Sequence, residues 1–558
     1  MSSAAPQDFI SNIPRRLGEA GDATVVQEIR GSEIVKVSGR ELSRMIQQAH
    51  ESIKERAPAL RAGDRCALLG PNSVRWIAMD LALMMKGIVV VPLYSRQAPA
   101  ELAAMVRDSG ASAIFCDGAE LQKSLADALQ EAPPTTLFDD IFESEAGSSG
   151  FSTNWSVGIE RPVTIIYTSG TSGEAKGVVL TAANINFMLS RTTAALDQLM
   201  GKRDAPDSVF HWTPLNFAAS WISMLTYLSR NSVVSLSTDL TKLADEMKIA
   251  APNYFLNVPT LLERVRTKIE ENIRGKSGWI AAIFAKAKRA YFADEGSSAG
   301  FSDRAALMAA KTLIFSTIRR GLGPSLKALI CGSAPLAVET QRFFTMLGIS
   351  VLQAYGLTET TAICTLDDPA HAEPGYVGRA IPGVEMKLGE NQEILVRGPN
   401  VFSGYWNRPE ETAKVLRDGW FHTGDQGEMN ARGNWKITGR IKNLIILNSG
   451  HNIAPEPLEE ELASHLPGAQ VMLSGNGRSY LIALVAANSG MTDAGVASVV
   501  ERVNARLPHY RQIRGFHRIA EPFTIESGML TANGKLKRDA VAAKFATEIE
   551  QLYRKRST

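Results

Sequence analysis

The sequence predicts an α/β fold, because three parts of the chain have different strand and helix patterns. Short apolar runs alternate with helical patterns through the first part. Short strands and glycine-rich turns follow at about 384–440. The last unit, of roughly a hundred residues, has its own strands and helices, a size that suits a separate small domain.

The early elements follow from their periodicity. Apolar runs of strand length occupy 65–70, 87–94 and 111–116, and helical patterns at 73–86 and 99–110 separate them. Strands joined by crossover helices are typical of a doubly wound sheet. We therefore predict such a sheet for the first part of the chain.

The later elements are shorter. The segments EILVRG and GEMNARGNWKITGR predict a β-rich, barrel-like piece. In the last unit we expect helices over 457–466 and 492–507, and strands over 469–475 and 480–487.

Composition narrows the class of protein. A chain of 558 residues is too long for one core, so one very large domain and at least one smaller one are expected. The net charge of +2 gives no bulk reason to expect nucleic acid. No basic, apolar leader opens the chain, and the longest apolar run is broken by Lys86 and Gly87, so we expect neither a signal peptide nor a membrane span. Four scattered cysteines favour reduced thiols in a cytoplasm over a disulfide frame or a zinc site: Cys66, Cys116, Cys331 and Cys364.

A run of small and hydroxyl residues, IIYTSGTSGEAKGVVLT, spans 165–181 between two apolar segments. Such a loop can turn its backbone N–H groups around an anion, and its hydroxyls and Lys176 add further donors. It is not the usual phosphate loop, because Lys176 follows Ala175 instead of a glycine. Taken alone, the run is equally compatible with a glycine-rich turn between strands.

Two further motifs carry groups that a nucleotide requires. LQAYGLTETTA places Tyr355 close to Thr358 and Glu359, and GWFHTGDQGEM offers Asp425 in an expected turn. An aromatic face stacks on a purine, one carboxylate can bind a ribose hydroxyl pair, and another can hold the metal of a triphosphate. A core aromatic, a helix-start carboxylate and a turn former are the ordinary alternatives. In combination the motifs indicate a nucleotide site.

With these motifs the chain resembles the adenylate-forming enzymes, the superfamily of acyl-CoA synthetases, luciferases and peptide-synthetase adenylation domains, and most of all its long-chain fatty acyl-CoA synthetase branch. The resemblance runs from GDRCALLGPNSVRWIAMDLALMMKGIVVVPL to LTANGKLKRDAV. It implies a large N-terminal domain, 1–440, with two α/β sheets and a β-rich subdomain, and a small mobile α+β domain, 441–558. It also implies two steps: a carboxylate and Mg-ATP give an acyl-adenylate and pyrophosphate, and a thiol, usually that of CoA, then displaces AMP.

The resemblance also assigns roles around the phosphates. The loop would cover the β- and γ-phosphates, with Thr168 also near Mg²⁺ and Glu359 as the carboxylate ligand of the ion. Its members are Thr168, Ser169, Gly170, Thr171, Ser172, Gly173 and Lys176. Lys535 matches the lysine that reaches the α-phosphate and the carboxylate, where a cation offsets the repulsion between two anions. A solvated surface lysine is the alternative.

Around the nucleoside, the resemblance implies that two segments frame the adenine. The framing residues are Gly332, Ser333, Ala334, Gln353, Ala354 and Gly356. Tyr355 would lie against the face of the base, Thr358 near the α-phosphate, and Asp425 and Arg440 on the ribose. Lys442 matches the hinge between the two domains.

The acyl site is the least defined. Phe217 stands where many family members have a histidine beside the acyl group, so we expect a more apolar pocket than usual. Trp221 is expected to line or gate the acyl channel, with a core tryptophan as the alternative. The segment 279–292 is expected to be a helix in which Trp279 shares one apolar arc with Ile283, and its lysines lie off that arc. That helix either lies on an anionic bilayer or packs as a surface helix with solvated lysines.

The predicted function is ATP-dependent ligation of a medium- or long-chain fatty acid to CoA, with Mg²⁺, ATP and CoA taking part. An acyl-AMP ligase, or an adenylation enzyme that loads a carrier protein, is the alternative within the class. A catalytically silent nucleotide- or acyl-binding sensor is the alternative outside it. Such a sensor should have lost Lys535 or Glu359, and both are present.

Overall fold

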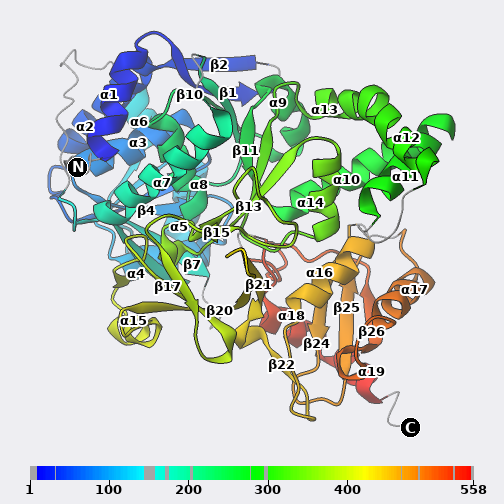
Figure 1. Cartoon of the computed structure of the whole chain (residues 1–558). Coiled ribbons are helices and arrows are strands. Elements are labelled where there is room, and N and C mark those ends of the chain that lie inside the picture. The colour runs from blue at the N-terminus through cyan, green and yellow to red at the C-terminus, as the bar shows by residue number, and fades with distance from the viewer. Residues whose placement is uncertain are drawn as a thin grey trace.

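Two large sheets form most of the molecule in the computed structural model (Figure 1), which describes residues 9–31, 33–143, 158–169, 175–201, 205–276, 278–293, 300–466, 468–487, 490–531 and 534–554. The nine-stranded sheet has the order β15-β14-β13-β12-β11-β9-β10-β1-β2. Its strands are β1 (Thr24–Arg30), β2 (Glu33–Ser38), β9 (Asp207–His211), β10 (Ser232–Ser237), β11 (Tyr254–Asn257), β12 (Ala328–Cys331), β13 (Ser350–Tyr355), β14 (Thr365–Leu366) and β15 (Arg379–Ala380).

The seven-stranded sheet has the order β18-β8-β7-β4-β3-β5-β6. It consists of β3 (Arg65–Gly70), β4 (Val89–Tyr94), β5 (Ala113–Cys116), β6 (Thr135–Leu137), β7 (Pro162–Ser169), β8 (Ala175–Thr181) and β18 (Gly404–Tyr405). The strands β3, β4 and β5 pair in parallel and match the runs predicted at 65–70, 87–94 and 111–116. The predicted doubly wound arrangement is therefore present.

Helices cover these sheets and are placed by their apolar faces and caps. They are α1 (Phe9–Ala20), α2 (Gly39–Arg56), α3 (Val74–Met85), α4 (Pro99–Ser109), α5 (Ala119–Ala128), α6 (Phe138–Phe142), α7 (Ala182–Met200), α8 (Ala218–Leu228), α9 (Leu243–Ala250), α10 (Pro259–Arg274), α11 (Gly278–Phe292), α12 (Phe301–Ala310), α13 (Ser316–Leu322) and α14 (Val338–Met346). Helix α3 is apolar on nearly all sides because it is buried on nearly all sides. It starts after Ser73, whose side chain accepts a hydrogen bond from the backbone of Trp76. Helix α4 starts at Pro99 and ends at Gly110, which has a positive φ of 60°.

A third sheet lies over the predicted β-rich stretch. It has the order β16-β17-β20-β19, with β21 paired to β20, and α15 (Pro409–Val415) interrupts it. The strands are β16 (Glu385–Leu388), β17 (Glu393–Arg397), β19 (Leu416–Arg417), β20 (Trp420–Met429) and β21 (Trp435–Arg440). Because this order has free ends, the described strands form an open sheet, and the expected barrel-like shape is wrong.

The last part of the chain has its own core. Its strands are β22 (Ile445–Ile446), β23 (Asn452–Ile453), β24 (Gln470–Ser474), β25 (Leu481–Ala486) and β26 (Ile513–Ile519), and its helices are α16 (Glu456–His465), α17 (Asp493–Asn504), α18 (Arg538–Lys544) and α19 (Ala546–Arg554). Two apolar clusters lie entirely within this part of the chain. Figure 1 shows it, in orange to red, at one edge of the molecule. The predicted boundary at 440/441 stays a prediction, which these separate clusters support.

Candidate active site

Three strand segments bring Tyr355, Asp425 and Arg440 together. The Tyr355 hydroxyl donates to Oδ2 of Asp425 at 2.8 Å, and Nε of Arg440 lies 2.9 Å from Oδ1 of the same carboxylate. Asp425 is almost fully buried, at 2% exposure, and pairs with Arg440 in the β20–β21 register. Both carboxylate oxygens therefore have fixed partners at the end of β13.

Asp425 lies in strand β20, so the turn expected for it is wrong. The register between β17 and β20 shifts between Glu393 and Leu395, and Gly424 has a φ of 70°, which favours glycine. This break in the ladder is why the sequence reads as a turn. It also lets the Asp425 carboxylate face Tyr355, as a bulge often does for a functional side chain.

Two lysines of the small domain approach this carboxylate. Lys535 keeps solvent contact at the junction of the two domains. The pKa of Lys535 is lowered to about 8, because partial loss of hydration and the positive charge of Arg440 both disfavour the ammonium. The negative charges of Asp425 and Glu359 act in the opposite direction. Burial and Arg440 also lower the pKa of Lys442 to about 8. Lys442 lies in the short turn Ile441–Asn443, directly after β21.

An open cavity of about 420 Å³ adjoins these groups. Its polar lining includes Asp425, Arg440 and Lys442 from the candidate site, together with Glu390, Asn391, Glu393, Arg417 and Thr423. The cavity therefore places three carboxylates and three cations around one opening.

The predicted adenine frame lies at the ends of β12 and β13. A Cβ on Gly356 would lie 2.3 Å from the carbonyl oxygen of Ala362, so only glycine fits there. Ser333 has a φ of 72°, a conformation that costs a non-glycine residue energy and often marks a functional site. Gln353 differs from the other members, because its amide donates to Gln341 and to the carbonyl of Tyr376 inside the fold. The Gln353 side chain therefore holds the adenine frame in place from inside the fold.

Glu359 is held by a tyrosine from another sheet. The Tyr405 hydroxyl donates to Oε1 of Glu359 at 2.8 Å, and Glu359 is 9% exposed. Thr168 lies at the end of β7, where its hydroxyl is 3.5 Å from the carbonyl oxygen of Lys176. Thr358 opens the 3₁₀ turn that contains Glu359. Carboxylate and hydroxyl oxygens suit Mg²⁺.

The donor set fits an ion that a nucleotide brings with it. Within the described ranges, no three His, Cys, Asp or Glu side chains cluster as a metal site. Mg²⁺ commonly takes one or two carboxylates and completes its shell with water and phosphate oxygens. Glu359 and Thr168 match that pattern and would hold the ion only together with a phosphate.

Lys176 is engaged by an acidic partner. Its ammonium lies 2.5 Å from Oε2 of Glu411 on α15 and 5.2 Å from the ring centre of Tyr405. The hydrogen bond from Lys176 is the largest of the contacts that lower the pKa of Glu411 to about 2. Of the predicted loop, residues 170–174 lie outside the described residues, as does the side chain of Ser169.

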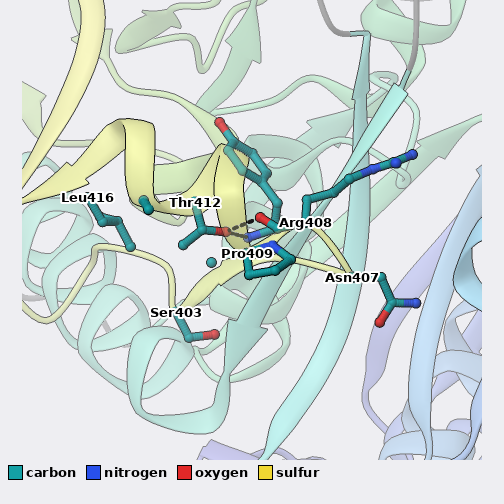
Figure 2. A pocket seen from close by; sticks show the side chains of 9 residues that line it. Ser403, Asn407, Arg408, Pro409, Thr412 and Leu416 are labelled. Atoms are coloured by element: carbon teal, nitrogen blue, oxygen red, sulfur yellow. Dashed lines mark hydrogen bonds between the residues drawn. The ribbon is translucent and has the colours of Figure 1, made fainter.

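A shallow pocket of about 450 Å³ lies where α15 meets β18 (Figure 2). Thr412 joins its wall, because the backbone N–H of Tyr405 donates to its Oγ1, and that hydroxyl donates to the carbonyl of Arg408. These bonds fix the turn that presents Tyr405 to Glu359. The residues around this pocket therefore help to hold Tyr405 against Glu359, the candidate metal ligand.

The acyl residues lie around helix α8. Phe217 precedes its first residue, and its ring centre is 6.0 Å from that of Tyr94. Trp221 is 1% exposed, and its indole N–H donates to Oδ2 of Asp80 on α3 at 2.8 Å. Burial raises the pKa of Asp80 to about 7, against the effect of that bond. Trp221 has the contacts of a core residue, and its role in the acyl channel stays a prediction.

Helix α11 confirms the predicted helix and corrects its buried face. Phe284 and Ala287 are buried, whereas Trp279 is 59% exposed, so the arc predicted through Trp279 is wrong at that residue. The Lys288 ammonium is not merely solvated, because it lies 2.7 Å from Oε1 of Glu270 and forms an ion pair with it. Of the helices in the described ranges, none has the length and apolar character needed to cross a membrane.

Three partners of the site were missed by sequence reasoning: Tyr405, Glu411 and Asp80. Each pairs with a predicted residue that lies between 46 and 235 positions away. No local pattern encodes such a pair. Only Asp80 gave a usable signal, as a lone carboxylate in an otherwise apolar helix.

Comparison with known proteins identifies the family. The AMP-binding enzyme profile matches residues 14–406, and that of the AMP-binding enzyme C-terminal domain matches 442–557. The chain belongs to the AMP-binding enzyme family. The predicted family and fold class are thereby confirmed.

Its relatives agree with the predicted branch. Long-chain-fatty-acid–CoA ligase FadD15 of Mycobacterium bovis is 30% identical over 538 residues, which cover 89% of each chain. Long-chain-fatty-acid–CoA ligase 5 of Rattus norvegicus is 28% identical over 561 residues, covering 87% of this chain and 79% of its own.

Solved structures share the fold and support the predicted fold class. The adenylation domain of a carboxylate reductase from Mycobacterium chelonae superposes with a TM-score of 0.78 at 21% identity, covering 99% of this chain and 92% of its own. O-succinylbenzoate coenzyme A synthetase from Bacillus subtilis, solved with AMP, has a TM-score of 0.73 at 20% identity, covering 95% and 97%.

Proposed function

We propose that this AMP-binding enzyme activates a medium- or long-chain fatty acid with Mg-ATP, through an acyl-adenylate, and transfers the acyl group to CoA. The observation that carries the proposal is a pair of oriented carboxylates: Tyr355 and Arg440 hold Asp425, and Tyr405 holds Glu359. The positive charge of Lys535, from the small domain, acts on both. Two carboxylates and a mobile cation are what adenylation of an anionic acid requires. The long-chain-fatty-acid–CoA ligase names of the relatives supply the substrate class.

In this proposal the nucleoside lies along Tyr355 and Asp425. Asp425 binds the ribose hydroxyls, aided by Arg440, and the ring of Tyr355 lies against the adenine beside Gly332 and Ser333. The hydrogen bond and the ion pair on Asp425 support this arrangement, because Tyr355 and Arg440 hold that carboxylate in one orientation. Ala334, Ala354 and Gly356 complete the frame without bulky side chains.

The phosphates lie between the two domains. Thr168, Lys176 and the loop at 169–173 bind the β- and γ-phosphates, and Thr358 lies near the α-phosphate. Mg²⁺, when bound, offsets phosphate charge between Glu359 and Thr168. Lys535 supplies the positive charge at the α-phosphate and carboxylate, and Lys442 is the hinge on which the small domain turns between the steps.

The acyl chain lies beside Phe217 and Trp221. An apolar Phe217 at the entrance suits a fatty acid better than a polar acid. The α11–α12 pair carries the exposed apolar residues Trp279 and Met308 and the basic residues Lys286 and Arg289, a combination that favours contact with an anionic membrane that supplies the acid. Contact with a membrane is a more specific addition to the proposal.

A pyrophosphate-release screen tests the proposal. Acids of graded chain length, together with aryl acids, are supplied with Mg-ATP, each with and without CoA. We expect release with medium- and long-chain acids and a thioester product only with CoA. Release without thioester formation would favour the alternative, an acyl-AMP ligase that loads a carrier protein, and no release with any acid would favour a silent sensor.

A further inference from the structure

One ion pair links the small domain to the large one two residues beyond Lys535. Nζ of Lys537 lies 3.0 Å from Oε1 of Glu101 on helix α4, 436 positions away in the chain. The two side chains are 34% and 44% exposed. The pair thus joins the loop that carries Lys535 directly to the large domain.

Glu101 also has a hydrogen-bond partner within the large domain. The amide of Gln97, which lies four residues earlier and just before α4, donates to Oε2 of Glu101 at 2.9 Å. Burial opposes ionisation of Glu101, but the bonds from Gln97 and Lys537 outweigh it and lower its pKa. The carboxylate is therefore ionised and fixed across the neutral range.

Lys537 and Lys535 belong to one backbone-hydrogen-bonded segment. The backbone N–H of Lys537 donates to the carbonyl of Met529 at 2.9 Å, and that of Thr531 donates to the carbonyl of Lys535 at 2.8 Å. Leu536 between the two lysines forms a bridge with Leu530. Residues two apart in an extended segment project to the same side. Fixing Lys537 therefore fixes the direction from which Lys535 enters the site.

A second attraction acts across the same junction. Arg96, which precedes α4, attracts Glu526, which lies in the segment leading to Met529. The neighbouring cation Arg538 is occupied elsewhere, because it pairs with Glu459 on α16. The Lys537–Glu101 pair is therefore the close contact between this loop and α4, at 3.0 Å, and the attraction of Arg96 for Glu526 has the same effect.

We propose that the Lys537–Glu101 pair is a latch that holds the small domain where Lys535 faces Asp425 and Glu359, which makes Lys537 and Glu101 positioning residues for acyl-adenylate formation. The inference rests on the proposed function and adds a device that selects between its two steps. A partly exposed ion pair contributes little free energy. That suits a contact that must open in every cycle, when the small domain turns for the thiol step.

The test compares the two half-reactions in Lys537→Met and Glu101→Gln. The matched control is Lys436→Met, which removes a lysine that is 2.9 Å from Glu428, at 44% and 49% exposure, within the β20–β21 hairpin alone. We expect pyrophosphate release to fall about two- to fivefold in both latch variants and to stay normal in the control. Thioester formation from supplied acyl-adenylate and CoA should be unchanged or faster.

Combined variants distinguish the loss of the ion pair from the loss of either side chain. Lys537→Met with Glu101→Gln should be no slower than either single variant, because the interaction is lost once. The swap Lys537→Glu with Glu101→Lys should recover most of the lost pyrophosphate release. The latch is wrong if Glu101→Gln behaves as wild type, or if both half-reactions slow equally.

A readout without turnover separates failure of the latch from failure of the proposed function. The native cysteines are all buried, so nitroxide labels can be directed to Glu120→Cys on α5 and Ala494→Cys on α17, both exposed positions. The distance distribution between the labels should broaden in the two latch variants and not in Lys436→Met. If the distance distribution broadens in an enzyme that activates no acid, the latch proposal stands and the proposed function is wrong. If the distances are unchanged in the latch variants of an active enzyme, the latch proposal is wrong.

Discussion

The hydroxyl of Tyr355, at the end of β13, donates to Oδ2 of Asp425 in β20 at 2.8 Å. This bond joins the candidate adenine and ribose positions, which come from two different sheets. A hydrogen bond to a charged acceptor contributes more than one between neutral groups. Loss of this bond should loosen the carboxylate that binds the ribose.

Tyr355→Phe keeps the ring and removes the donor. We expect KM for ATP to rise about tenfold, the equivalent of about 1.4 kcal/mol, because Asp425 then keeps only Arg440 as a fixed partner. Tyr355→Ala should be worse, because the stacking face is lost as well. Tyr480→Phe, which removes a hydroxyl from the small domain, is the control. Equal effects of Phe and Ala at 355 would contradict stacking on the adenine.

Glu411 competes with a triphosphate for Lys176. In Glu411→Gln the ammonium is released from its 2.5 Å contact, so we expect KM for ATP to fall about two- to threefold, as for the loss of an exposed pair. Its neighbour Glu410→Gln is the control. Because the pKa of Glu411 is about 2, the gain should be constant from pH 5 to 8. A rise in KM would show that Glu411 instead orients Lys176 for the phosphate.

Asp80 predicts a pH-dependent stability. Its folded pKa of about 7 lies above the usual value of 3.8, so the folded protein binds the extra proton and stability falls as pH rises from about 4 through 7. Asp80→Asn keeps an acceptor for the Trp221 indole without a charge. We expect it to be more stable than the wild type at pH 8 by about 1–3 kcal/mol, and by a smaller margin at pH 5.

Denaturant unfolding at the two pH values measures this difference. Asp127→Asn, at an exposed carboxylate on α5, is the control for a general effect of removing an acid. A variant that is less stable than the wild type at pH 8 would show that the ionised carboxylate of Asp80 is needed in the core.

The buried parallel strands were predictable, because they read as continuous apolar runs bounded by helical patterns. Strand β26 was missed, since IRGFHRI carries arginines and a histidine between its apolar residues and is mostly half-buried. The candidate nucleotide residues could be predicted because their types fit the chemistry. Their partners could not, because contacts such as Tyr405 with Glu359 depend on how distant strands pair.

Lys535 gives the prediction that separates the two steps most sharply. Its pKa of about 8 means that the ammonium loses its proton as pH rises through 8. Only the protonated form can offset charge at the α-phosphate. We therefore expect kcat/KM for pyrophosphate release to fall above pH 8, since this parameter reports the free enzyme. Lys535→Arg, which stays charged, should lack that fall, although its rate is lower.

Lys442 has a similar pKa, so it must be distinguished from Lys535. In Lys442→Arg the alkaline fall should remain, because Lys535 still titrates. Lys535→Ala should lower acyl-adenylate formation about a hundred- to a thousandfold. Thioester formation from supplied acyl-adenylate and CoA should be largely preserved, because the small domain has then turned Lys535 away. An alkaline fall that disappears in Lys442→Arg and persists in Lys535→Arg would transfer the titrating role to Lys442, and equal loss of both steps in Lys535→Ala would make Lys535 a structural residue.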